Sequence, residues 1–186
     1  MKALLHIFCI LSLGFFMSTD NSADVHIKKG SQITISGKSN VNQFSCAYTT
    51  QIAEGGKNIT YNYFSNVITL NKAEIKLKSD AFDCGGKMIN KDFNELMQSE
   101  DYPNVGITLI QIAVKEKVYV VDAMIEIADE INVYSFVISP RQGDHYTGSL
   151  ELNINDFDME APRKLLGAIK VDPNINIEFD LYLEVI

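Results

Sequence analysis

The sequence predicts an all-β domain in which antiparallel strands form a barrel and one short helix accompanies them. Three observations support this: long segments alternate apolar and polar residues, short polar turns separate them, and one segment has helical spacing. About eight strands can be counted, and strands with one apolar and one polar face suit a curled or closed antiparallel sheet. A two-sheet sandwich has the same pattern, so the sequence leaves that alternative open.

The start of the chain has the pattern of a secretory signal peptide. Met1-Lys2 is followed by an apolar run, Ala3 to Met17, and then by the small and polar residues Ser18 to Ala23. The run is shorter than the ~18 residues expected of a membrane-spanning helix, so an uncleaved anchor is the less favoured alternative. We therefore expect a signal peptide at residues 1–23, a folded domain at 24–186 that does not span a membrane, and a periplasmic or secreted location.

Charge and cysteine content narrow the class of protein further. The chain has a net charge of −8, and removal of residues 1–23 takes away one charge of each sign, Lys2 and Asp20. An acidic protein without a Lys/Arg cluster is a poor candidate for binding nucleic acid. The remaining cysteines, Cys46 and Cys84, form an even pair in an exported protein, which favours a disulfide over two buried thiols.

The segment from Phe82 to Leu109 is the one around which the chain is organised. Gly85-Gly86 predicts a turn, and Met88, Phe93, Leu96 and Met97 then recur at helical spacing, which predicts an amphipathic helix over 88–98. Tyr102-Pro103 ends that helix, and Val105 begins a strand. A lone helix between long strands commonly covers an open end of a sheet or barrel, and we expect that here.

The remaining elements are strands separated by turns. The phase of the alternation changes between Leu70 and Ala73 and again between Leu109 and Ile110, which indicates a bulge or turn at each place. Loops or turns are expected at 37–42, 54–58, 115–117, 129–130 and 140–144. Strands are expected at 32–36, 44–50, within 61–78, and at 105–114, 119–127, 131–139, 146–154 and 175–185.

The sequence offers little evidence of catalysis. His26 and His145 lack Cys or carboxylate partners at metal-ligand spacing, and no nucleophile elbow or phosphate-binding loop is visible. We expect no catalytic residues, no metal, no cofactor and no enzymatic activity. An eight-stranded barrel can be filled by side chains or hold one small ligand, and a filled core would explain the apolar strand faces without any ligand.

Several short motifs, in order, resemble the YceI-like proteins. They are Gly37-Lys-Ser-Asn-Val-Asn-Gln-Phe44-Ser-Cys46, Phe82-Asp83-Cys84, Lys91-Asp92-Phe93 with Leu96, Tyr102-Pro103, Gly148-Ser-Leu150, Asp156-Phe157 with Pro162, and Gly167 to Val171. The resemblance implies an exported, lipocalin-like, eight-stranded antiparallel β-barrel with a long apolar cavity, which in some members holds a polyisoprenoid or quinone-like lipid. Two features depart from the family: Gly86 to Asp92 replaces an Arg-Asp…His arrangement, and Asp129 replaces a turn glycine.

These observations lead to one main expectation and one alternative. The main expectation is a binding protein for a hydrophobic small molecule, either a polyisoprenoid or a quinone-like lipid, for transport or storage. The alternative is a barrel with a filled core that acts in the envelope through protein–protein contacts, and homodimer formation is left open. The residues expected to line the ligand cavity are Phe44, Ile125, Ile127, Leu150, Leu152, Phe179, Leu181 and Leu183.

Overall fold

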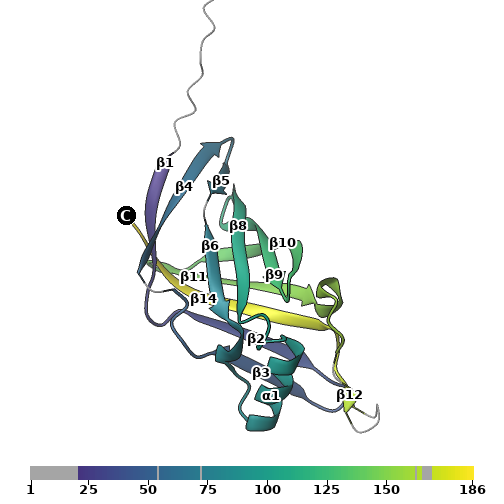
Figure 1. Cartoon of the computed structure of the whole chain (residues 1–186). Helices are drawn as coiled ribbons and strands as arrows, with labels where there is room; N and C mark the ends of the chain where they lie inside the picture. The colour runs from purple at the N-terminus through teal and green to yellow at the C-terminus, as the bar shows by residue number, and fades with distance from the viewer. Residues whose placement is uncertain (1–20, 54, 72, 162, 165–168) are drawn as a thin grey trace, which may run out of the picture.

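The computed structural model describes residues 21–186 apart from 54, 72, 162 and 165–168. Within this part, antiparallel strands predominate and one α-helix, α1 (Lys87–Leu96), lies at what we call the lower end (Figure 1). Two short 3-10 helices are η1 (Ser79–Ala81) and η2 (Ile154–Phe157). The strands are β1 (Asn21–Ile27), β2 (Gln32–Lys38), β3 (Gln43–Tyr48), β4 (Gly56–Phe64), β5 (Val67–Asn71), β6 (Glu74–Lys78), β7 (Phe82–Asp83), β8 (Asn104–Lys115), β9 (Val118–Ile127), β10 (Glu130–Pro140), β11 (His145–Asn153), β12 (Arg163–Lys164), β13 (Ile169–Lys170) and β14 (Asn174–Val185).

Eight of these strands form a closed ring. Its order is β1-β4-β5-β8-β9-β10-β11-β14, and the pairing of β14 with β1 closes it. β14 pairs with β1 near its C-terminal end and with β2 along Asn176–Asp180, so β1 and β2 act as one interrupted strand. β5 and β6 likewise pair with successive parts of β8. The expected eight-stranded antiparallel barrel with one short capping helix is therefore confirmed.

Both expected changes of phase correspond to breaks in the strands. β5 ends at Asn71 and β6 begins at Glu74. In β8 the register with β9 shifts between Leu109 and Gln111, which is a β-bulge. Because of the bulge, Ile107 and Leu109 before it and Ile112 after it line the same space inside the barrel.

Two hairpin loops each contain a pair of residues with positive φ. Ser65 and Asn66 have φ of 53° and 66°, and Ala128 and Asp129 have φ of 50° and 70°. Two-residue hairpin loops need this left-handed backbone, and Asp tolerates it better than most residues other than Gly and Asn. Asp129 can therefore occupy the turn position at which the YceI-like resemblance implies a glycine. The turn lies one residue earlier than expected, because Glu130 already belongs to β10.

The N-terminal part of the domain differs most from the expectation. The sequence did not predict β1, and the expected loop at 54–58 is wrong for Gly56 to Asn58, which begin β4. These three residues pair with His26 to Asp24 of β1, so strand pairing outweighs the local glycine content. Most of the expected signal peptide, residues 1–20, lies outside the described residues, and its last three residues are the first part of β1.

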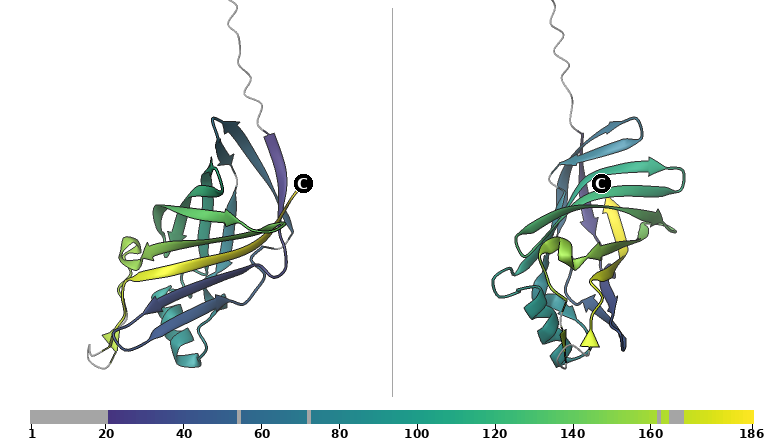
Figure 2. Two further views of the ribbon diagram at one scale, coloured as in Figure 1. Left: turned by 180° about the vertical axis from the view of Figure 1, so that it is seen from behind. Right: turned by 90° about the vertical axis from the view of Figure 1, so that its right-hand side faces the viewer.

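The helix α1 packs against the lower end of the barrel beside β2 and β3 (Figure 2). Phe93 and Met97 are buried, and the Phe93 ring lies 5.4 Å from the Phe82 ring. The helix thus covers one end, as expected. The prediction that Met88 belongs to the apolar edge of the helix is wrong, because its side chain is 80% exposed. The buried edge contains Phe93 and Met97, and Met88 lies on another side of the helix.

Candidate ligand-binding site

The inward-facing side chains divide the barrel into a filled lower half and a hollow upper half. On β9, Val121, Ile125 and Ile127 are almost completely buried, whereas Tyr119, nearer the upper end, is only partly buried. On β14, Phe179 is buried, and the inward residues on both sides of it, Ile177 below and Leu181 above, are partly buried. The two halves differ in the space between these side chains: Leu181 and Leu183 border a larger cavity in the upper half, which is therefore not close-packed.

Side chains from the lower-end helices fill the lower half. Phe93 comes from α1, Met97 is the residue that caps its C-terminal end, and Ile154 and Phe157 come from η2; all four belong to one buried apolar cluster with Phe82. A void of about 70 Å³ remains among them. This half of the barrel is a conventional hydrophobic core.

The upper half encloses an apolar cavity of about 360 Å³. This volume lies near the lower limit of the ~300–1,000 Å³ typical of small-molecule sites. Its lining is mainly aliphatic, and the lining residues that carry a polar group are Lys57, Glu74, Tyr119 and Tyr146. The other lining residues are Val25, Ile27, Ile33, Ile52, Ala53, Ile59, Ile68, Ala73, Ile75, Ile107, Leu109, Ile112, Val121, Phe136, Ile138, Phe179, Leu181, Leu183 and Val185.

The cavity reaches solvent where β14, β1 and β4 lie side by side. Val25 pairs with Val185 on one side and with Lys57 on the other, and all three border the cavity. Lys57 and Val185 are exposed, Val185 by 65%. A bound molecule could therefore keep a polar end near the Lys57 ammonium while its apolar part lies inside.

A layer of large side chains separates the cavity from the void in the lower half. Ile33, Ile107 and Phe179 border both spaces. The Phe179 ring stacks on the Phe136 ring with centroids 5.3 Å apart and an interplanar angle of 21°. We call Ile33, Ile107, Phe136 and Phe179 the floor of the cavity.

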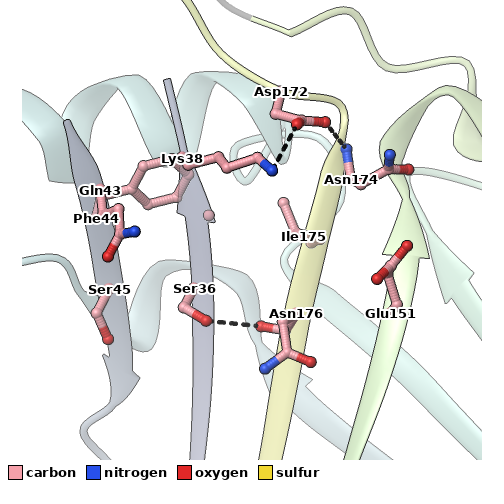
Figure 3. A pocket seen from close by; sticks show the side chains of 11 residues that line it. Ser36, Lys38, Gln43, Phe44, Ser45, Glu151, Asp172, Asn174, Ile175 and Asn176 are labelled. Atoms are coloured by element: carbon pink, nitrogen blue, oxygen red, sulfur yellow. Dashed lines mark hydrogen bonds and ion pairs between the residues drawn. The ribbon is translucent and has the colours of Figure 1, made fainter. Parts of the chain in front are cut away.

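A second hollow, of about 550 Å³, lies on the outer surface and is polar (Figure 3). Glu151, Asn176, Ser36 and Ser45 form one row across β11, β14, β2 and β3. The Asn174 amide donates to Asp172, and this bond, with the Lys38 ammonium 3.5 Å away, holds the pKa of that carboxyl below its usual value. Most of the side chains that line this hollow are charged or polar, so it is a poor site for an apolar ligand.

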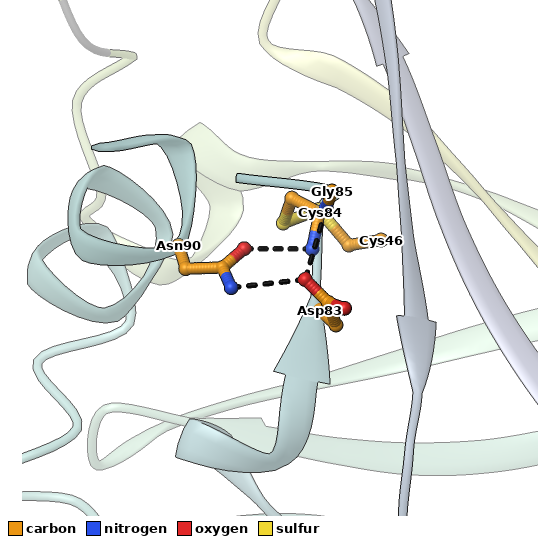
Figure 4. The surroundings of a disulfide bond; sticks show 5 residues. All are labelled: Cys46, Asp83, Cys84, Gly85 and Asn90. Atoms are coloured by element: carbon orange, nitrogen blue, oxygen red, sulfur yellow. Dashed lines mark hydrogen bonds between the residues drawn. A yellow bond between two sulfur atoms is a disulfide. The ribbon is translucent and has the colours of Figure 1, made fainter. Parts of the chain in front are cut away.

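A disulfide joins β3 to the turn that leads into α1. Cys46 and Cys84 are bonded, as expected, and Cys46 is completely buried. The Asn90 side chain accepts from the Cys84 amide at 2.7 Å and donates to Asp83 at 3.0 Å (Figure 4). The hydrogen bond from Asn90 and one from the Gly85 amide hold the pKa of Asp83 below its usual value. Gly85 has a φ of 83°, which explains a glycine in this turn.

A tyrosine ties η2 to the barrel wall. The Tyr134 hydroxyl donates to the Asp156 carboxylate at 2.5 Å, and its ring stacks on Phe157 at 6.1 Å. Burial and this carboxylate raise the pKa of Tyr134 to about 12, so the phenol stays protonated at physiological pH. The interaction stabilises the closed lower end and lies apart from the upper cavity.

The structure distributes the expected lining residues between the two halves. Phe179, Leu181 and Leu183 border the upper cavity. Phe44, Ile125 and Ile127 border the small lower void, as Phe179 does from above. Leu150 and Leu152 are buried, with exposures of 3% and 0%, and border neither space.

Several cavity residues lie on strands that the sequence identified without singling them out. Ile68 lies in the expected strand region 61–78, and Tyr119 and Tyr146 face each other with ring centroids 6.3 Å apart. Ile59, on β4, lies just outside the expected region. For Ile112, the phase change at Leu109 was a usable signal, because it implies that even-numbered residues face inward after the bulge.

The described residues contain no group of three or more His, Cys, Asp or Glu side chains that could hold a metal ion. In the same part of the chain, no helix has the length and apolar character needed to cross a membrane. The cavity lining contains aliphatic and aromatic side chains at nearly all positions. Its chemistry is therefore that of an apolar binding site.

Together, the ring and the cavity define the class: an antiparallel eight-stranded barrel, filled at one end and hollow at the other. The fold is shared with BcnA of Burkholderia cenocepacia, with a TM-score of 0.60 and 16% identity over 83% of this chain and 96% of that one. It is also shared with a polyisoprenoid-binding domain of Saccharophagus degradans implicated in plant cell wall breakdown, with a TM-score of 0.57 and 10% identity over 88% and 98%.

A YCEI protein of Campylobacter jejuni aligns over 66% of this chain and 79% of its own, with a TM-score of 0.45 and 11% identity. No family model and no curated protein matches the sequence. The similarity to the first two structures confirms, at the level of the fold, what the YceI-like resemblance implies.

Proposed function

We propose that the protein is an exported, non-enzymatic binding protein that holds one hydrophobic chain, a polyisoprenoid or quinone-like lipid, in the upper cavity for transport or storage. The observation that carries this proposal is the hollow upper half, where inward side chains such as Leu181 and Leu183 surround about 360 Å³ without filling it. The fold it shares with a polyisoprenoid-binding domain supports the choice of ligand class.

The driving force would be burial of apolar surface. Each Å² of apolar ligand surface removed from water contributes ~25 cal/mol before the cost of ordering the chain. Lys57, at the mouth, would contact the polar end of the ligand, and Glu74 is a second charged residue that borders the cavity. The Glu74 carboxylate oxygen lies 3.3 Å from the Lys76 ammonium nitrogen, so the charge of Glu74 is already partly compensated.

An observation on the outer surface favours the alternative, a protein that acts through protein–protein contacts. Ile131, Val133 and Val137 alternate along the exposed face of β10, and Met124 pairs with Val133 from β9. Four exposed apolar side chains on two neighbouring strands could contact a partner protein.

Native mass spectrometry of the protein purified without detergent from its exported compartment tests the proposal. A stoichiometric adduct, identified after solvent extraction, supports a lipid carrier and names the ligand. A protein that has no adduct, and that takes up neither isoprenoids nor quinones on incubation, contradicts it and favours the alternative.

Two arginine variants sharpen this test. Leu181→Arg places a charge in the cavity and should abolish loading, whereas Val137→Arg places the same charge on the outer face and should leave loading unchanged. If folded Leu181→Arg protein retains full loading, the ligand lies elsewhere.

A further inference from the structure

The floor of the cavity is built from rigidly held side chains. Phe136 and Phe179 are each only 7% exposed and stack on one another, and Ile33 pairs with Phe179 across β2 and β14. Ile33 is 3% exposed, so three of the four floor residues are buried and Ile107 is partly buried.

The space below the floor is too small to receive more of a ligand. The void there measures about 70 Å³, against about 360 Å³ above. A chain that extended past the floor would have to displace Phe179 into a half of the barrel that is already filled. Forcing extra atoms into a packed core is unfavourable, so a bound chain must end at the floor.

From this geometry we infer that the stacked pair Phe136 and Phe179 limits the length of the apolar chain that the protein binds, and so selects a short prenyl chain over a long one. The inference rests on the proposed function, because it concerns the same cavity. It adds a specificity-determining pair that acts by ending the cavity.

A series of prenyl alcohols tests the inference directly. Geraniol, farnesol, geranylgeraniol and the much longer solanesol would be titrated into delipidated protein, with binding followed by native mass spectrometry. For the wild-type protein we expect affinity to increase with length up to a limit and then to decrease. In Phe179→Ala the limit should move to a longer alcohol, with the first alcohol beyond the wild-type limit bound about tenfold more tightly or better.

Matched variants separate the floor from general effects of core truncation. Phe179→Leu is a milder change that should move the limit in the same direction if Phe179→Ala fails to fold. Phe93→Leu makes the same change below the floor and should leave the limit unchanged. Leu109→Phe fills part of the upper cavity and should move the length limit to a shorter alcohol.

The outcomes distinguish this inference from the proposed function. A length limit that is the same in the wild type, Phe179→Leu and Leu109→Phe overturns the role of the floor while leaving a lipid-binding cavity in place. A wild-type protein that binds none of the four alcohols overturns the proposed function, and the inference with it.

Discussion

The division of the barrel into a filled and a hollow half predicts that two leucines of similar sequence context contribute very differently to stability. Leu152 on β11 is completely buried, whereas Leu181 on β14 borders the upper cavity and is only partly buried. Each would be replaced by alanine. The change removes the same atoms from two inward-facing positions of neighbouring strands.

The magnitudes follow from the packing of each site. For Leu152, the loss of about three buried carbons costs ~2.4 kcal/mol in transfer free energy, and the new cavity raises the total to about 3–5 kcal/mol. For Leu181, part of the side chain already faces empty space and no new cavity is enclosed, so we expect about 1 kcal/mol. A loss of 1 kcal/mol lowers the melting temperature of a domain of this size by ~2–4 °C. The melting temperature should therefore fall by roughly 10 °C in Leu152→Ala and by about 3 °C in Leu181→Ala.

The free energies of unfolding would be measured by urea-induced unfolding of delipidated protein, followed by far-UV circular dichroism, and compared where the variants have the same m-value. Heating the same samples gives the melting temperatures. Binding of a prenyl alcohol should show the reverse order, with Leu181→Ala weakened and Leu152→Ala unchanged. Equal losses of stability, or a larger loss for Leu181→Ala, would refute the division into two halves.

Three further predictions concern other parts of the fold. Replacing Cys46 and Cys84 by serine should lower the free energy of unfolding by about 4 kcal/mol, measured in guanidinium, because the disulfide closes a long loop. Asn90→Ala should raise the pKa of Asp83, which an NMR titration measures. Because the pKa of this carboxyl is lower in the folded protein than in the unfolded chain, its ionised form stabilises the fold at pH values above the pKa of the unfolded chain. This stabilisation is lost as the pH falls through the pKa of the folded protein. Gly148→Ala should destabilise by about 1–3 kcal/mol in thermal unfolding, because its Cβ would lie 2.7 Å from a backbone carbonyl oxygen.

The sequence predicted the strands well where apolar and polar residues alternate over a long continuous segment. It placed the interruptions near Leu70 and Leu109 correctly, because a change of phase is visible without knowledge of the partner strand. It missed β1, whose pairing with β4 and β14 closes the ring. That strand has few large apolar residues, and its stability comes from pairing with strands distant in the sequence, which local composition does not show.

The position of the cavity could not be predicted from the strand pattern. Leu152 and Leu181 look alike in sequence, since both alternate with polar neighbours and both face inward. They differ because α1 and η2 add Phe93 and Phe157 to the buried cluster at the lower end. Which end receives those side chains is a property of the tertiary fold.

The two halves share the long strands β8 and β14 but place different demands on the residues in them. Packing at the lower end keeps the chain folded, so the residues around the upper cavity can change without removing most of that packing. Substitutions around the upper cavity could therefore change its size and shape while the stability of the fold stayed nearly constant. Under the proposed function, the residues that would determine ligand specificity are separated, along the barrel axis, from most of the residues that stabilise the fold.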